Sequence, residues 1–279
     1  MMRTLSYATV LLFLTQLFLT QLFLTQPAFG QAPEQLADVV MATVRLTNPK
    51  SSATGFVLVR PKTNDGQTGR LALITAAHVL EKAEGDEITV GFRRQEADGG
   101  YSRLPVTLKV RNNGKPLWSK HPKHDVAAIE IESPQGVEPH RLTVEHLATA
   151  ADLKAVEPGE LVHCLTYPHA PVFEPNQPGF PVIRLGCLAS FPLIPIEKQP
   201  TFLVDYNAFE GDSGGPVVWK TTEQAGGKAT IKILGLVQGQ HLFNQRYELP
   251  YESGEFRKSL GLGIVLNALA IHETINQLP

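Results

Sequence analysis

Short apolar runs separated by clusters of turn residues fill the chain from residue 39 onward. Such runs, bounded by Gly, Pro, Asn and Asp, are typical of β-strands joined by tight turns. The predicted strands are 39–46, 55–59, 71–75, 87–92, 104–110 and 126–131 in the first half, and 161–165, 182–188, 201–206, 216–219, 231–238 and 263–266 in the second. About six strands in each half, with a turn signal about every ten residues, predict two all-β units, either barrels or sandwiches.

Helical periodicity is confined to short segments. Apolar residues three and four apart over Asn267–Gln277 predict a closing helix. Leu142–Leu153 is expected to form a short helical linker between the two halves. We therefore divide the chain into a leader, an N-terminal β-unit, and a C-terminal β-unit that includes the linker and the closing helix, with the bounds 1–30, 31–140 and 141–279.

Residues 1–30 have the pattern of a secretory signal peptide. Arg3 is their only charge, Leu11–Leu24 is apolar apart from Thr and Gln, and small residues at 28 and 30 precede a cleavage point at Gln31. A retained membrane anchor is the alternative, but the stretch is near the lower limit of about 17 residues for a spanning helix. We expect cleavage, a secreted or periplasmic protein, and no integral membrane span afterwards.

Composition narrows the classes of function. The 279 residues are 43% hydrophobic and 19% charged, which is enough apolar material for a sizeable core. With 25 basic and 27 acidic residues, the formal charge of −2 gives no electrostatic reason to expect nucleic acid or an anionic membrane as a partner. The 21 Pro and 23 Gly favour many turns and argue against a helical bundle.

Cys164 and Cys187 are the only two cysteines. Because export would place the chain in a compartment where disulfides persist, a bridge between them is expected. A metal site that adds His163 and His169 is the alternative, but the spacing lacks the close ligand pairs of structural zinc sites. We therefore expect neither a metal nor a cofactor.

Three segments carry candidate chemistry. His78 follows an apolar run within Leu73–Leu80, Asp125 opens the apolar run Val126–Ile129, and Ser213 lies in the Gly-rich segment Glu210–Pro216. Alone, such a His, an Asp at a strand entry and a Gly-rich Ser turn are each commonly structural. Their appearance together in the order His, Asp, Ser makes coincidence improbable, because an activated serine needs a base and a group that orients the base.

Together, Thr75-Ala76-Ala77-His78 and Gly211-Asp212-Ser213-Gly214-Gly215-Pro216 resemble the trypsin-like (chymotrypsin-fold) serine peptidases over roughly residues 38–276. The resemblance implies an all-β fold of two six-stranded antiparallel β-barrels, with the active site in the cleft between them and a C-terminal helix. It also implies a cofactor-free endopeptidase whose substrates are proteins or peptides.

The resemblance assigns a role to each motif residue. Ser213 would attack the substrate carbonyl, His78 would take and later return the proton, and Asp125 would orient the imidazole, as in the family that serves as the general template for this chemistry. The backbone N–H groups of Gly211 and Ser213 would form the oxyanion hole.

The sequence departs in several ways from the animal digestive members of the family. These differences indicate a bacterial type of trypsin-like peptidase, similar to the glutamyl endopeptidases and the heat-shock peptidases. Val79 follows the histidine, and no Ile-Val-Gly-Gly activation sequence precedes the first unit. Asp212 is therefore expected to contact either another partner or solvent in place of a freed N-terminal amine. About a dozen residues follow Asn267, so we expect no appended PDZ module.

The sequence gives little indication of which substrate residue the enzyme prefers beside the cleaved bond. By resemblance, Asn207 would form the base of the substrate pocket, Gln238 and Gln240 one wall, and Gly263 another. A neutral amide at Asn207 does not select a basic substrate residue. Gln238 replaces a small hydroxyl residue, which puts the support of Asp125 in question. Two rival functions stay open: a catalytically silent trypsin-like domain that binds proteins, and an esterase with the same triad.

Overall fold

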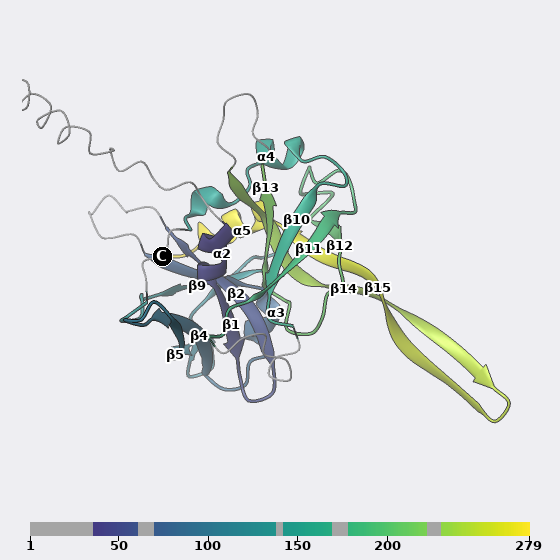
Figure 1. Ribbon diagram of the computed structural model, residues 1–279, viewed down its shortest axis with the longest axis horizontal. Helices are drawn as coiled ribbons and strands as arrows, with labels where there is room; N and C mark the ends of the chain where they lie inside the picture. Colours follow the sequence, from purple (N-terminus) through teal and green to yellow (C-terminus); the bar gives the residue numbers. More distant parts are fainter. Residues whose placement is uncertain (1–35, 61–69, 138–141, 169–177, 222–229) are drawn as a thin grey trace, which may run out of the picture. The chain divides into compact units, whose positions relative to one another are not determined.

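Two β-sheets follow one another along the chain (Figure 1). The computed structural model describes residues 36–60, 70–137, 142–168, 178–221 and 230–279. The expected signal peptide, residues 1–30, lies outside this part of the chain. Within the described residues, no helix has the length and apolar character needed to cross a membrane.

The first sheet has seven strands, with β5 and β8 at its edges. Its order is β5 (Tyr101–Lys109), β4 (Glu87–Gln95), β1 (Thr43–Thr47), β2 (Ser52–Val59), β3 (Leu71–Thr75), β9 (Ala127–Ile131) and β8 (Ser119–Lys120), and all neighbours are antiparallel. A separate two-stranded ribbon joins β6 (Arg111–Asn112) to β7 (Lys115–Pro116).

The second sheet is a closed six-stranded barrel. Its order is β10 (Leu161–Thr166), β11 (Val182–Leu188), β12 (Thr201–Asp205), β15 (Glu252–Asn267), β14 (Ile231–Leu249) and β13 (Pro216–Lys220). The all-β prediction with two antiparallel sheets is confirmed. The first sheet differs from the predicted six-stranded barrel in two respects: it has edges at β5 and β8, and the short β8 adds a seventh strand beside β9.

Helices are short and lie at the ends of the sheets. They are α2 (Leu36–Ala42), α3 (Ala77–Glu81), the 3₁₀ turn η1 (Val144–His146), α4 (Ala150–Ala155) and α5 (Ala268–Ile275). The predicted closing helix is confirmed as α5, and the Asn267 side chain caps it by accepting a hydrogen bond from Leu269 N. The prediction of a strand at 39–46 is wrong for residues 39–42, because Val39 and Ala42 lie on one helical face and are both buried.

One apolar cluster joins the two sheets. It contains Phe56 and Ile74 from the first sheet together with Leu165, Val217 and Leu236 from the barrel. A second cluster lies within the first sheet and includes the buried residues of β4. Because side chains of both sheets share the larger core, the packing that stabilises the fold also fixes the junction where residues of the two sheets meet.

The expected disulfide is not formed, and both thiols are free. In the pairing of β10 with β11, Cys164 faces Arg184 and Cys187 faces Leu161. Three residues along a strand span about 10 Å, whereas bridged Cα atoms lie within about 7 Å. Successive side chains of a strand point to opposite faces of the sheet. Because Cys164 is three residues from Leu161, the residue opposite Cys187, the two cysteine side chains lie on opposite faces. The prediction of a Cys164–Cys187 bridge is therefore wrong.

Thiol reactivity tests this correction. Burial raises the pKa of the Cys164 thiol to about 12, whereas Cys187 is only partly buried. We expect Ellman's reagent to modify one thiol in the native, unreduced protein, none rapidly in Cys187→Ser, and two after unfolding without reductant. A protein that shows no thiol until a reductant is added would contradict the free-cysteine assignment.

Candidate active site

His78 is positioned by the end of a fully buried strand. All five residues of β3 are buried, and the strand ends at Thr75. Helix α3, which carries His78, begins two residues later. The Thr75 hydroxyl donates to the backbone carbonyl of Thr54 at 2.7 Å, which fixes the strand end against β2. The His78 side chain keeps 28% of its surface exposed, so the imidazole is open to a substrate while its position is fixed.

Asp125 holds His78 at two points. The His78 ring atom Nδ1 lies 2.6 Å from Asp125 Oδ2, and the His78 backbone N–H donates to Oδ1 at 2.8 Å. Burial of Asp125 favours its neutral form, but the hydrogen bonds from His78 outweigh burial, and the pKa of Asp125 is lowered. The carboxylate is therefore ionised at neutral pH and accepts the Nδ1 proton, which leaves Nε2 as the basic atom of the ring.

Gln238 supplies the support for Asp125 that the sequence put in question. Its side-chain Nε2 donates to Asp125 Oδ2 at 3.3 Å, and this bond also lowers the pKa of the carboxyl group. An amide on a longer side chain thus replaces the small hydroxyl residue. Spacing alone could not reveal this contact, because Gln238 lies on β14 of the barrel, whereas Asp125 lies just before β9 of the first sheet.

Ser213 lies in a loop that is clamped against β2. Thr54 N donates to the Ser213 carbonyl at 3.0 Å, and the Thr54 hydroxyl donates to the Gly211 carbonyl at 2.8 Å. Gly214 has φ +89°, and a Cβ there would lie 2.1 Å from the Thr54 carbonyl oxygen. Both the backbone conformation and this close approach therefore require glycine at position 214.

The Ser213 hydroxyl points to β14. Its Oγ donates to the backbone carbonyl of Gln238 at 3.3 Å, and among the described residues it makes no hydrogen bond to His78. The structure thus joins His78 to Asp125 directly and joins both Asp125 and Ser213 to Gln238. The resemblance implies that His78 takes the Ser213 proton, and in this conformation no hydrogen bond joins these two side chains.

The loop also presents free backbone donors. Within the described residues, the N–H groups of Gly211 and Ser213 donate to no backbone acceptor, whereas those of Asp212, Gly214 and Gly215 do. Gly211 has φ +98°, a conformation that glycine adopts at little cost. Unpaired N–H groups on either side of Asp212 match the donor pair that the sequence predicts for an oxyanion.

Asp212 has a partner that the sequence did not reveal. Its Oδ2 lies 2.5 Å from Arg184 Nη2, and its side chain is 2% exposed. Arg184 also donates to the Asn207 carbonyl and the Thr166 hydroxyl, each at 2.6 Å, and its guanidinium lies over the ring of Tyr206. This cation, whose side chain is 19% exposed, is the partner that Asp212 contacts in place of a freed N-terminal amine. In the sequence, the signal that could have indicated this partner was a basic residue, Arg184, at an inward position of β11.

Of the four predicted pocket residues, the structure brings one to a cavity near the site. Asn207 lines an open pocket of about 450 Å³ with Arg184, Phe209 and Gly261. Gln238, Gln240 and Gly263 do not line it. A Cβ on Gly263 would lie 2.2 Å from the Tyr206 ring, so the ring fills the space beside this glycine.

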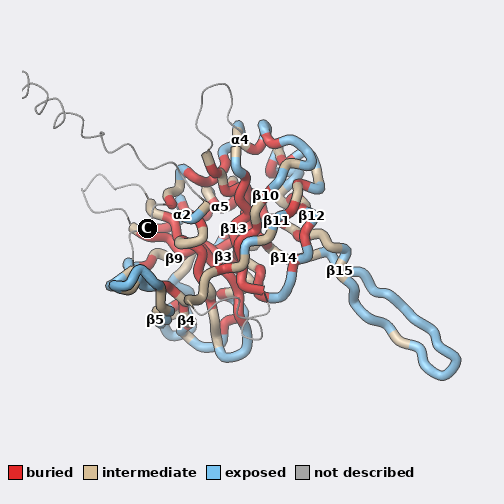
Figure 2. Tube along the Cα trace, viewed as in Figure 1, coloured by how far each residue is buried: buried red, intermediate tan, exposed pale blue. Residues whose placement is uncertain are grey.

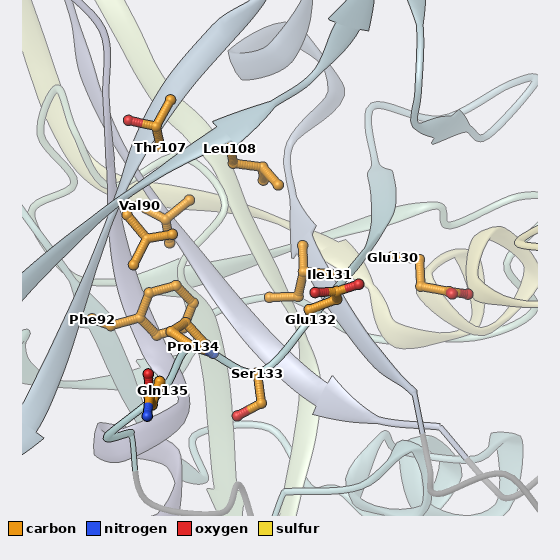
Figure 3. A pocket seen from close by; sticks show the side chains of 11 residues that line it. Val90, Phe92, Thr107, Leu108, Glu130, Ile131, Glu132, Ser133, Pro134 and Gln135 are labelled. Carbon is orange, nitrogen blue, oxygen red and sulfur yellow. The ribbon is translucent and has the colours of Figure 1, made fainter.

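A second cavity, of about 500 Å³, lies on the first sheet (Figure 3). Side chains from β4, β5 and the segment after β9 surround it, and none of the predicted site residues lines it. Among the described residues, no group of three or more His, Cys, Asp or Glu side chains is placed to hold a metal ion. His121, four residues before Asp125, instead has a structural contact, with Nε2 2.8 Å from Glu273 of α5.

The Arg184–Asp212 pair should contribute strongly to stability. Arg184→Met leaves a buried carboxylate without its cation, and we expect the free energy of unfolding to fall by about 3–5 kcal/mol, measured by urea denaturation. Arg184→Met combined with Asp212→Asn should recover part of this loss. The control is Arg246→Met, because the exposed Arg246–Glu255 pair contributes little. Equal effects of the two arginine substitutions would contradict this role.

Comparison with known proteins identifies a family and similar solved structures. Similar solved structures include two of the Rv3671c protease, described as inactive forms, one of them a serine-to-alanine mutant from M. tuberculosis H37Rv. Each is 19% identical to this chain, with a TM-score of 0.46. The alignment with the mutant covers 91% of this chain and 93% of the mutant chain. The alignment with the other structure covers 88% of this chain and 98% of the other chain. No curated protein matches the chain. The family model of the trypsin-like peptidase domain matches residues 53–226, which include His78, Asp125 and Ser213, and the chain therefore belongs to the trypsin-like peptidase domain family.

Proposed function

We propose that this chain is an exported serine endopeptidase that hydrolyses peptide bonds through an acyl-enzyme. Ser213 is the nucleophile, His78 the general base and then the general acid, and Asp125 the residue that orients the imidazole. The N–H groups of Gly211 and Ser213 stabilise the oxyanion of the tetrahedral intermediate. Protein or peptide substrates follow from the peptidase family, and the mechanism needs no cofactor.

The observation that carries the proposal is the double contact of Asp125 with His78. One carboxylate oxygen accepts from the ring and the other from the backbone N–H of the same residue. This arrangement fixes both the tautomer and the direction of the ring, which are the two properties that a general base toward a serine requires. A histidine with only a structural role needs neither.

Each step of the reaction has a residue to perform it. As Ser213 Oγ bonds to the substrate carbonyl carbon, its proton moves to His78 Nε2, and the carbonyl electron pair becomes the oxyanion. Collapse of the intermediate breaks the peptide C–N bond, and His78 returns the proton to the leaving amine. Water then repeats the sequence on the acyl group, again with His78 as base.

The orientation of the Ser213 hydroxyl favours the rival function, a silent binding domain, but only weakly. Its bond to the Gln238 carbonyl, at 3.3 Å, is longer than the usual 2.5–3.0 Å of a hydroxyl hydrogen bond. A neutral hydrogen bond contributes about 0.5–1.5 kcal/mol net, so rotation of one side-chain torsion toward His78 costs little. Substrate binding supplies far more than this amount, and the catalytic function is therefore favoured.

Export and the domain bounds rest on the sequence alone. The charge and apolar pattern of residues 1–30 supports a cleaved signal peptide. We divide the remaining chain into units at 31–140 and 141–279. In this division, His78 and Asp125 lie in the first unit and Ser213 lies in the second, after the linker.

Hydrolysis of a denatured protein substrate by purified residues 31–279 tests the proposal. Ser213→Ala should lower kcat by about 10⁶-fold, since single triad members behave as a unit. Ser133→Ala, which changes an exposed serine in the segment after β9, is the matched control and should leave kcat unchanged.

Circular dichroism and thermal unfolding should show that both variants fold like the parent chain. If the folded parent chain and Ser213→Ala are equally inactive toward protein substrates while both bind them, the silent binding domain is the better account.

A further inference from the structure

The ribbon formed by β14 and β15 extends far beyond the barrel, and we call residues 240–262 the arm. Figure 2 shows it as a mainly exposed projection from the end of the barrel. Its strands pair continuously from Leu242 opposite Ser259 to Leu249 opposite Glu252. The sequence did not predict the arm, because polar residues outnumber and interrupt its apolar ones, so that no apolar run of strand length forms.

The two faces of the arm differ in chemistry. Strand alternation and the β14–β15 register place four apolar side chains on one face, which we call the apolar face: Phe243, Tyr247, Leu249 and Phe256. All are exposed, Leu249 by 59% and Phe256 by 46%, and the rings of Tyr247 and Phe256 lie 6.4 Å apart. An apolar stripe on a solvent-exposed ribbon indicates a surface that a partner covers.

The opposite face is polar apart from Leu242, which is 45% exposed. It carries Asn244, Arg246, Glu255 and Arg257, with Arg246 Nε 3.3 Å from Glu255 Oε2 across the two strands. This face resembles an ordinary solvated sheet surface. The contrast between the faces shows that the arm is amphipathic rather than uniformly polar, so a partner would bind to one side of it.

The arm also has an unpaired backbone edge that begins beside Ser213. In the described part of the chain, β13 pairs with β14 only up to Leu236, and from Gln238 to Leu249 the outer edge of β14 has no strand partner. Gln238 is the residue whose carbonyl accepts from Ser213 Oγ. A row of unsatisfied N–H and C=O groups thus leads from the candidate nucleophile along the arm.

We propose that the arm binds an extended, apolar polypeptide substrate, which adds as a third strand to the free edge of β14 and covers the apolar face. The inference rests on the proposed function, because it concerns the part of a substrate that is remote from the bond cleaved at Ser213. It names the substrate class: long unfolded chains or segments with apolar residues at alternate positions.

Three observations favour this occupant. A two-stranded ribbon is only marginally stable alone, and a third strand adds backbone hydrogen bonds along its length. The apolar face carries one cation, Lys258, and one anion, Glu252, so it has no net charge to attract an acidic or basic partner. A lipid bilayer would leave the edge N–H and C=O groups unpaired, whereas a polypeptide pairs them.

Two variants separate the apolar face from the rest of the arm. Phe243→Ser with Phe256→Ser removes two rings of the apolar face, one from each strand. Asn244→Ser with Arg257→Ser makes the matched change on the polar face, again one residue from each strand. Circular dichroism should show that both double variants retain the fold.

Substrate length is the readout. The substrates share one cleavable peptide, either alone or extended by a segment of alternating apolar residues as long as the β14 edge. For the apolar-face variant, we expect kcat/KM on the long substrate to fall about tenfold or more, mainly through KM, since exposed aromatic anchors dominate such interfaces. The short substrate and the polar-face variant should be unaffected. Equal kcat/KM values for both variants on the long substrate would overturn the proposal.

Binding to Ser213→Ala keeps this test separate from the catalytic one. Fluorescence anisotropy should show tight binding of the labelled long segment, weakened by the apolar-face change and not by the polar-face change. That result would support the arm as a polypeptide site even if the parent chain proved inactive, in which case only the proposed catalysis would fail. If the apolar-face change instead converts a dimer to a monomer and leaves segment binding unchanged, the occupant is a second copy of this chain and the proposal is wrong.

Discussion

Thr54 is the residue on which the site geometry depends. It is fully buried on β2, and its N–H and hydroxyl bind the carbonyls of Ser213 and Gly211 in the loop of the second sheet. Its own carbonyl accepts from the Thr75 hydroxyl, at the strand end that leads to His78. One side chain and its peptide groups thus set the candidate nucleophile and the candidate base in a common frame. Because these bonds are shielded from water, losing one would leave a buried polar group unsatisfied.

The serine loop is fixed from its other side by charge. Arg184 holds Asp212 inside the barrel, while Gly214 allows the backbone to pass against the Thr54 carbonyl. Tight packing and a buried ion pair therefore orient the same loop from opposite directions. This arrangement accounts for a loop conformation in which the Gly211 and Ser213 N–H groups have no backbone acceptor. A site whose donors are fixed before substrate arrives needs little reorganisation during the reaction.

The sequence predicts local features better than contacts between sheets. Alternating apolar runs placed most strands, and the motif around Ser213 identified the family, because both depend on neighbouring residues. The free Cys164, the Arg184–Asp212 pair and the Gln238 bond to Asp125 depend on strand register, which no short window of sequence specifies. The arm was missed for a related reason: polar residues interrupt both of its strands, and its apolar side chains gather on one face only through strand alternation and pairing.

The central claim is that His78 and Asp125 activate Ser213, and reaction with a fluorophosphonate probe tests it most directly. Peptide mass mapping of the labelled protein should place the probe on Ser213. The labelling rate should fall by about 10⁴-fold in Asp125→Asn, because the substitution removes the acceptor that fixes the imidazole tautomer. Labelling of another residue, an unchanged rate in Asp125→Asn, or no labelling of the folded chain would contradict the account.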